Sequence, residues 1–357
     1  MKKRTILSIA ALSLFFAAAC QKSDIQISEG NSNQENRSEQ PARVKIEIAA
    51  AQTKTTLEQS AEQDNKISKV EVFVFKNTDP SSSDYHQLDT YQSFAAEELS
   101  SIEVLSTTGP KIVCVVANSH NADLSGITNF ETFKESVTSL QNEKLGDFTM
   151  YGEATHEFEL TNTLTISLSR FVSRIGITSV KTKFDGTSYQ GQTLTNCKLF
   201  LVNANGEKLL YNGGNPATPV ILNEAKLVDG DVSGCAQEGL LVDDIAVAIE
   251  GTPYITPHYF YAYSNETQSI ANCTKLVLQA DLAGVTYYYP ILINQADYGY
   301  QPENGHYGVG RNNTYSYSIT VTRAGSNDPN TPLVAGSVEI TLNVEPWNVV
   351  PHFDKEF

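Results

Sequence analysis

Short stretches in which apolar and polar residues alternate recur along most of this chain. In residues 43–50, Val44, Ile46 and Ile48 fall on one side, and charged residues lie between them. Successive side chains of a β-strand point to opposite faces, so a period of two predicts a strand with one buried face. The first recognisable element of the chain is therefore a half-buried strand.

The same signature continues toward the C-terminus, with turn residues between the stretches. Helical spacing interrupts it once, at Phe130, Phe133, Val137 and Leu140, which predict one short helix packed on a sheet. Such a pattern predicts a mainly β fold of the β-sandwich type. Further strands are predicted over 69–75, 102–105, 111–117, 164–168, 175–177, 198–202, 275–280, 287–293, 315–322 and 337–344.

The strands divide into two sets. One set, with the helix, precedes residue 166 and a second set follows, which predicts an N-terminal β-sandwich over 43–166 and a C-terminal one over 167–357. The last strand lies within 336–350 and ends at a proline. Its apolar face consists of Val338, Ile340, Leu342 and Val344.

The N-terminus carries the features of an export signal. Three basic residues precede about a dozen apolar ones, and small residues then lead to Cys20. Residues 1–19 are therefore predicted to be a lipoprotein signal peptide, with Cys20 as the residue that receives the lipid. Residues 20–42 are polar and predict a flexible tether between the lipid and the fold.

Charge and cysteine content narrow the class of protein. The formal net charge is −16, which argues against nucleic-acid binding because that requires clustered Lys and Arg. No segment after the signal has the roughly 18 consecutive apolar residues of a transmembrane helix.

Cys114 lies in an apolar run and is predicted to be buried. Of Cys197, Cys235 and Cys273, two could pair as a disulfide, and the sequence leaves this open.

Known catalytic motifs are absent from the sequence. It has no G-x-S-x-G, H-E-x-x-H or P-loop pattern, and its histidines are scattered. Four aspartates could bind calcium in a loop, but they lack the D-x-D-x-D-G order: Asp229, Asp231, Asp243 and Asp244. We therefore expect neither an enzyme nor a cofactor or metal site.

In combination, several motifs resemble those of the FimA-type major fimbrillins, the stalk subunits of a fimbria made by Gram-negative gut and oral anaerobes. The similarity covers nearly the whole chain. It rests on the lipobox, the first two strands, the ending of the strand over 111–118, the basic strand over 170–175, and the segments 288–294, 311–317 and 344–347.

This resemblance implies two tandem transthyretin-like β-sandwiches and a subunit that polymerises by donor-strand exchange. A protease would remove the first strand, which carries Val44, Ile46 and Ile48, and the donor strand within 336–350 of another subunit would replace it. Family members are cut after an arginine, whereas the matching loop here offers Lys54.

The implied partners are further copies of the chain, fimbrial tip and anchor proteins, and the processing protease. The precursor is expected in the outer membrane through its lipid. The mature subunit is expected in a surface fimbria that supports adhesion and biofilm formation.

Two alternatives remain at this level. One is a tip or anchor subunit of the same fold. The other is a monomeric glycan-binding surface lipoprotein, for which the tyrosines at 287–289 and 298–317 could supply an aromatic platform.

Overall fold

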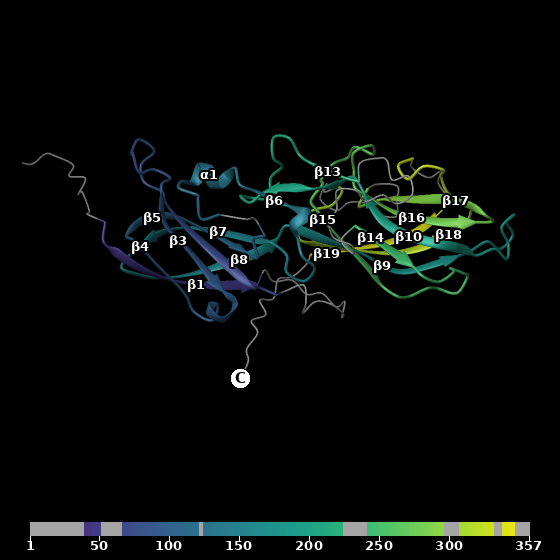
Figure 1. Cartoon of the computed structure of the whole chain (residues 1–357), viewed down its shortest axis with the longest axis horizontal. Helices are drawn as coiled ribbons and strands as arrows, with labels where there is room; N and C mark the ends of the chain where they lie inside the picture. Colours follow the sequence, from purple (N-terminus) through teal and green to yellow (C-terminus); the bar gives the residue numbers. More distant parts are fainter. Residues whose placement is uncertain are drawn as a thin grey trace, which may run out of the picture. The chain divides into compact units, whose positions relative to one another are not determined.

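The computed structural model describes residues 39–50, 66–120, 124–223, 241–295, 307–331 and the backbone of 338–346. Strands dominate them, as the alternation predicts (Figure 1). The strands are β1 Pro41–Ala50, β2 Lys69–Lys76, β3 Leu88–Ala95, β4 Ile102–Thr107, β5 Gly109–Ala117, β6 Val137–Ser139, β7 Met150–Phe158, β8 Thr161–Arg170, β9 Val172–Thr182, β10 Leu194–Val202, β11 Ala204–Asn205, β12 Glu207–Leu209, β13 Ile221–Leu222, β14 Val242–Ile245, β15 His258–Tyr263, β16 Lys275–Leu282, β17 Val285–Leu292, β18 Asn313–Val321 and β19 Val338–Pro346. The helical elements are α1 Phe130–Lys134 and two 3₁₀ turns, Ala96–Glu98 and Leu140–Asn142.

The N-terminal half contains one seven-stranded sheet in the order β3-β2-β5-β7-β8-β1-β4. β7 and β8 pair only at Met150↔Arg170 and Tyr151↔Ser169, so the sheet can fold there into two layers. The hydroxyl of Thr90 on β3 donates to the carbonyl of Leu105 on β4 at 2.6 Å, which joins the two outer strands. A buried apolar cluster fills the interior and draws on both layers, including Val72, Val104, Val115, Ile166 and Leu168.

Two sheets form the C-terminal half. One has four strands in the order β14-β10-β16-β17, and the other has six in the order β13-β11-β15-β9-β18-β19. Buried side chains from both sheets belong to one apolar cluster, for example Leu199 and Leu278 from the first and Ile175 and Tyr317 from the second. The mainly β, sandwich-type fold that the strand pattern predicts is thus confirmed; we call the folded N-terminal sheet and this C-terminal pair of sheets the two sandwiches.

The boundary between the two sets lies slightly later than residue 166. β8 remains in the first sheet as far as Arg170, and β9 begins the six-stranded sheet at Val172. The chain therefore changes sheet at Phe171, whose ring is buried.

The predicted helix is shorter than its apolar spacing suggested. The side chain of Asn129 caps α1 by accepting a hydrogen bond from the backbone N–H of Thr132 at 2.8 Å, and the helix ends at Lys134. Val137 lies instead on β6, which pairs with β12, and Leu140 begins a 3₁₀ turn. The prediction of one helix through Leu140 is wrong because pairing with a distant strand, not helical packing, orders these residues.

Candidate functional site: the slot of the first strand

β1 lies inside the N-terminal sheet and not at its edge. It pairs antiparallel with β4 on one side, with Val44 opposite Val104. On the other side it pairs in parallel with β8, with Ile46 opposite Leu164. Removal of β1 would therefore leave two strands with unpaired backbone groups and a gap between them, which we call the β1 slot.

The side chains of β1 follow the predicted alternation. Ala42 and Val44 are completely buried and Ile46 is 3% exposed, whereas the charged residues between them are exposed. Ile48 is partly buried against the same apolar cluster. The β1 slot is thus an apolar groove that needs one strand with small or medium apolar residues at every second position.

Polar residues lie at one end of the β1 slot. Ala42 lies opposite Ser106, whose hydroxyl donates to the Asp89 carboxylate. That carboxylate also pairs with Lys111 at 3.2 Å, and the side chains of both charged residues are almost completely buried. The Lys111 ammonium donates to the Thr107 hydroxyl at 2.8 Å. Ala42, which is completely buried, is the β1 residue opposite Ser106 in this network.

β19, the predicted donor strand, has a different position. It pairs antiparallel with β18 from Val321↔Val338 to Asn313↔Pro346 and is the last strand of its sheet. Among the described strands, β1 therefore has two neighbours and β19 has one.

The predicted site residues are placed as follows. Val44, Ile46 and Ile48 lie on β1, and Val338, Ile340, Leu342 and Val344 lie on β19, in another sheet of the same chain. Cys20 and Lys54 fall outside the described residues. The structure does not bring the two strands together within one subunit.

Two buried polar contacts between the sandwiches were not found in the sequence. The first joins Glu143 to Tyr263, both completely buried: the tyrosine hydroxyl donates to the carboxylate at 2.6 Å. The backbone N–H of Thr149 donates to the other carboxylate oxygen at 2.8 Å. Thr138 lies 3.2 Å from the same hydroxyl.

The second contact is made by Arg311, in the loop before β18. Its guanidinium donates to the carbonyl oxygens of Arg170 at 2.8 Å and Ser169 at 2.7 Å. It also stacks over the ring of Phe171 at 4.2 Å. Gly213 has a positive φ, and a Cβ there would come within 3.1 Å of the guanidinium. The sequence analysis singled out the segment 311–317, but nothing local to it indicated the partners of Arg311.

Glu143 should make the stability of the fold depend on pH. Burial raises the pKa of its carboxyl above the ordinary value of 4.5, although hydrogen bonds from Tyr263 and Thr149 oppose the shift. The folded state then holds the proton more tightly than the unfolded state, so this contribution to stability is present at low pH and is lost as pH rises. We expect the free energy of unfolding to fall above pH 4.5 in the wild type, and this component of the fall to vanish in Glu143→Gln.

Chemical denaturation at a series of pH values would measure this dependence. The control is Glu157→Gln, because Glu157 is exposed. An unchanged pH profile in Glu143→Gln would contradict the assignment.

The other residues singled out in the sequence have structural partners or lie apart. Asp243 lies 2.6 Å from His258 Nδ1, and Asp244 lies 3.9 Å from Lys198, while Asp229 and Asp231 fall outside the described residues. Cys114 is buried as predicted. Cys197 and Cys273 are both free thiols and do not pair with each other, and Cys235 falls outside the described residues.

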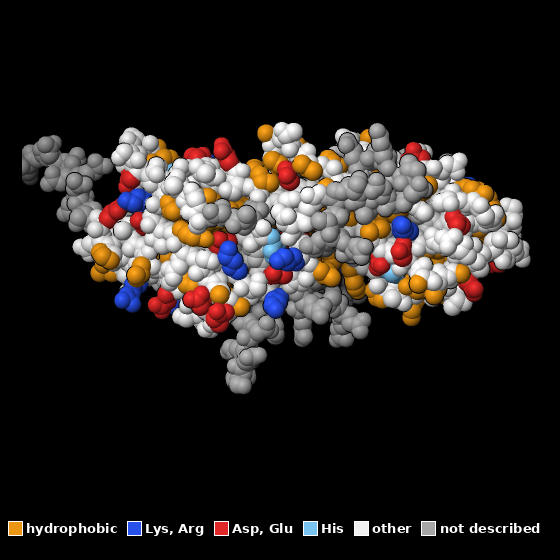
Figure 2. Space-filling model, in the orientation of Figure 1, with side chains coloured by type: hydrophobic (Ala, Val, Ile, Leu, Met, Phe, Trp, Pro, Cys, Tyr) orange, Lys and Arg blue, Asp and Glu red, His pale blue; other side chains and the backbone are white. Residues whose placement is uncertain are grey.

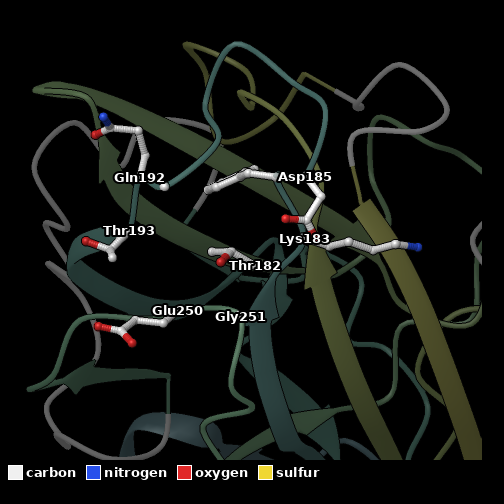
Figure 3. Close-up of a pocket in the computed structure, with 9 residues that line it drawn as sticks. Thr182, Lys183, Asp185, Gln192, Thr193, Glu250 and Gly251 are labelled. Carbon is white, nitrogen blue, oxygen red and sulfur yellow. The ribbon is translucent and has the colours of Figure 1, made fainter.

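Three tyrosines of the glycan alternative are core residues, and Tyr298 and Tyr300 fall outside the described residues. Tyr289, Tyr315 and Tyr317 are completely or almost completely buried, and Tyr287 and Tyr288 are partly buried. A polar hollow of about 360 Å³ lies at the end of β9, and none of these tyrosines lines it. Asp185, Gln192, Thr193 and Glu250 surround it (Figure 3).

The described residues on the face drawn in Figure 2 show no concentration of positive charge. On the face drawn in Figure 2, Lys and Arg side chains are interspersed with acidic ones, and hydrophobic side chains form small separate groups. No helix of the described residues is long and apolar enough to cross a membrane.

Solved structures share this arrangement of sandwiches. A fimbrilin from Porphyromonas gingivalis is similar to this chain with a TM-score of 0.61 at 21% identity, over 87% of this chain and 98% of that one. A Parabacteroides distasonis protein whose description connects it with cell adhesion is similar with a TM-score of 0.62 at 17% identity, over 86% and 96% of the two chains. The fold is therefore that of the fimbrillin-like β-sandwich proteins.

Sequence comparison defines the family more closely. The family model described as "Major fimbrial subunit protein (FimA)" matches residues 42–212. The major fimbrium subunit FimA type-5 of Porphyromonas gingivalis is 39% identical over 67 residues, and the match spans 18% of this chain and 17% of that relative. The sequence match over residues 42–212 and the fold therefore both point to the FimA-type fimbrillins.

Proposed function

We propose that this protein is the stalk subunit of a surface fimbria, that it polymerises by protease-triggered strand exchange, and that it has no enzymatic role. The observation that carries the proposal is the position of β1: an interior strand, apolar on one face, that precedes all the other strands of its sheet. Such a strand can be removed by a single cut between β1 and β2, and its departure creates a binding site for one extended strand.

The energetics of the pairing favour exchange. β19 would give up one backbone ladder, with β18, and gain two, with β4 and β8 of another subunit. Each additional ladder hydrogen bond contributes about 0.5–1.5 kcal/mol. Each large apolar side chain buried in the slot contributes roughly 1.5–3 kcal/mol. This is β-strand addition used for polymerisation.

Processing and location complete the proposal. Acylation of Cys20 would anchor the precursor in the outer membrane, and cleavage after Lys54 would release β1 from the mature chain. Mature subunits would then assemble with one another and with anchor and tip proteins, in a fimbria that supports adhesion and biofilm formation.

We expect a lysine-specific protease to convert the monomeric precursor into polymers whose subunits begin at Thr55. Size-exclusion chromatography before and after cleavage, followed by N-terminal sequencing, measures both effects. Lys54→Ala combined with Lys66→Ala should keep the treated protein monomeric, because both basic cleavage sites before β2 are removed. A treated wild type that loses β1 yet stays monomeric would favour an accessory subunit or a monomeric glycan-binding protein.

A further inference from the structure

The inward residues of β1 and the alternate residues of the C-terminal segment match in size as well as in their period of two. From Ala42, β1 presents the inward residues Ala, Val, Ile and Ile at alternate positions. From Gly336, the C-terminal segment presents Gly, Val, Ile and Leu at alternate positions. The two series match in size, one position after another, when both strands run in the same direction.

We propose a direction and a register for the strand exchange, on the basis of the proposed function above. Residues 336–344 of a second copy enter the β1 slot parallel to β8 and antiparallel to β4. Gly336 takes the place of Ala42, Val338 that of Val44 and Ile340 that of Ile46.

The polar end of the slot fixes the register. Ala42 is completely buried and lies opposite Ser106, whose hydroxyl donates to Asp89 of the buried Asp89–Lys111 pair. A shift of two residues would place Val338 there, and the reversed strand in the corresponding register would place Val344 there. Either valine adds two methyl groups at a position that is completely buried around an alanine, which forces the surroundings apart. Gly336 adds no volume.

The direction follows from the two ladders. The backbone groups of β4 and β8 are positioned for a strand that runs antiparallel to β4 and parallel to β8. In the structure, Val44 is the partner of Val104 and of Asn162. A donor that runs as β1 does can take over both ladders as they stand. A reversed donor would exchange the parallel and antiparallel patterns, whose hydrogen bonds are spaced differently.

One outward contact opposes this register. Glu339 would replace Lys45, which lies opposite the exposed Glu103. Exposed charges are screened by solvent, so their repulsion weakens the junction less than an overfilled position in the groove. The inward fit therefore decides the register.

Disulfide trapping tests the proposal, because a disulfide requires Cβ atoms about 3.5–4.5 Å apart and neighbouring registers differ by two residues. Glu103→Cys with Glu339→Cys should give a covalent ladder on a non-reducing gel after cleavage and mild oxidation. The partners lie in different sheets of one chain, so the ladder reports contacts between copies.

Two matched double variants report the competing arrangements. Leu105→Cys with Glu339→Cys would trap the same direction shifted by two residues. Leu105→Cys with Asn343→Cys would trap the reversed strand. If either of these variants gives the dominant ladder, or if fibres form in which no pair is trapped, the proposed register is wrong. Strand exchange itself is not contradicted by these outcomes. Absence of polymers in the wild type and all variants overturns the proposed function and this inference with it.

Discussion

Replacing Ile340 by aspartate should abolish fibre formation, and replacing Thr341 by aspartate should leave it nearly unchanged. In the proposed junction, Ile340 occupies the place of Ile46, which is 3% exposed, and Thr341 occupies the place of the exposed Glu47. A carboxylate in the apolar groove costs several kcal/mol at each junction. Electron microscopy and sedimentation of cleaved protein would measure the difference.

A mixing experiment separates this effect from misfolding. The Ile340→Asp subunit keeps its own β1 slot, so after cleavage it should still accept the C-terminal strand of a wild-type subunit. Equal loss of fibres in both aspartate variants would assign the segment another role. Normal fibres in both would remove it from assembly.

Replacing Arg311 by alanine should lower the free energy of unfolding by about 3–5 kcal/mol. The guanidinium makes two hydrogen bonds to carbonyl oxygens at the junction of the sandwiches, and hydrogen bonds to charged groups contribute about 1.5–3 kcal/mol each. Lysine cannot make both bonds from one planar group, so Arg311→Lys should recover only part of the loss. Denaturant unfolding would measure all three proteins.

Lys144→Ala provides the matched control, because Lys144 is exposed and its removal should change the unfolding free energy by less than about 0.5 kcal/mol. If Arg311→Ala were as stable as this control, the contact would not hold the two sandwiches together.

The fold was predictable wherever a strand has one buried face. β1 shows this best, because the alternation of Val44 and Ile46 with charged residues is the alternation of buried and exposed side chains. The prediction failed at Val137, since its order comes from pairing with β12, about 70 residues later in the chain. The pattern of apolar residues within ten positions carries no information about a pairing partner so distant in the chain.

The candidate site was predictable in part for the same reason. Sequence alone identified the two strands, but it could not show that one is an interior strand and the other an edge strand. It also could not locate the Asp89–Lys111 pair beside Ser106, because the two residues of this pair come from different strands. The sequence did not reveal the contacts of Glu143 with Tyr263 and of Arg311 with Arg170 for the same reason, because each joins residues that are distant in the chain.

The unequal positions of β1 and β19 have a consequence for the growth of a polymer. A subunit that still holds β1 has no vacant slot, yet its β19 is an edge strand with a single neighbour among the described strands. Under the proposed mechanism it can donate but cannot accept, so its addition stops growth at that end. Uncleaved precursor would then act as a chain terminator, and the ratio of cleaved to uncleaved subunits would set the mean length of the fibres.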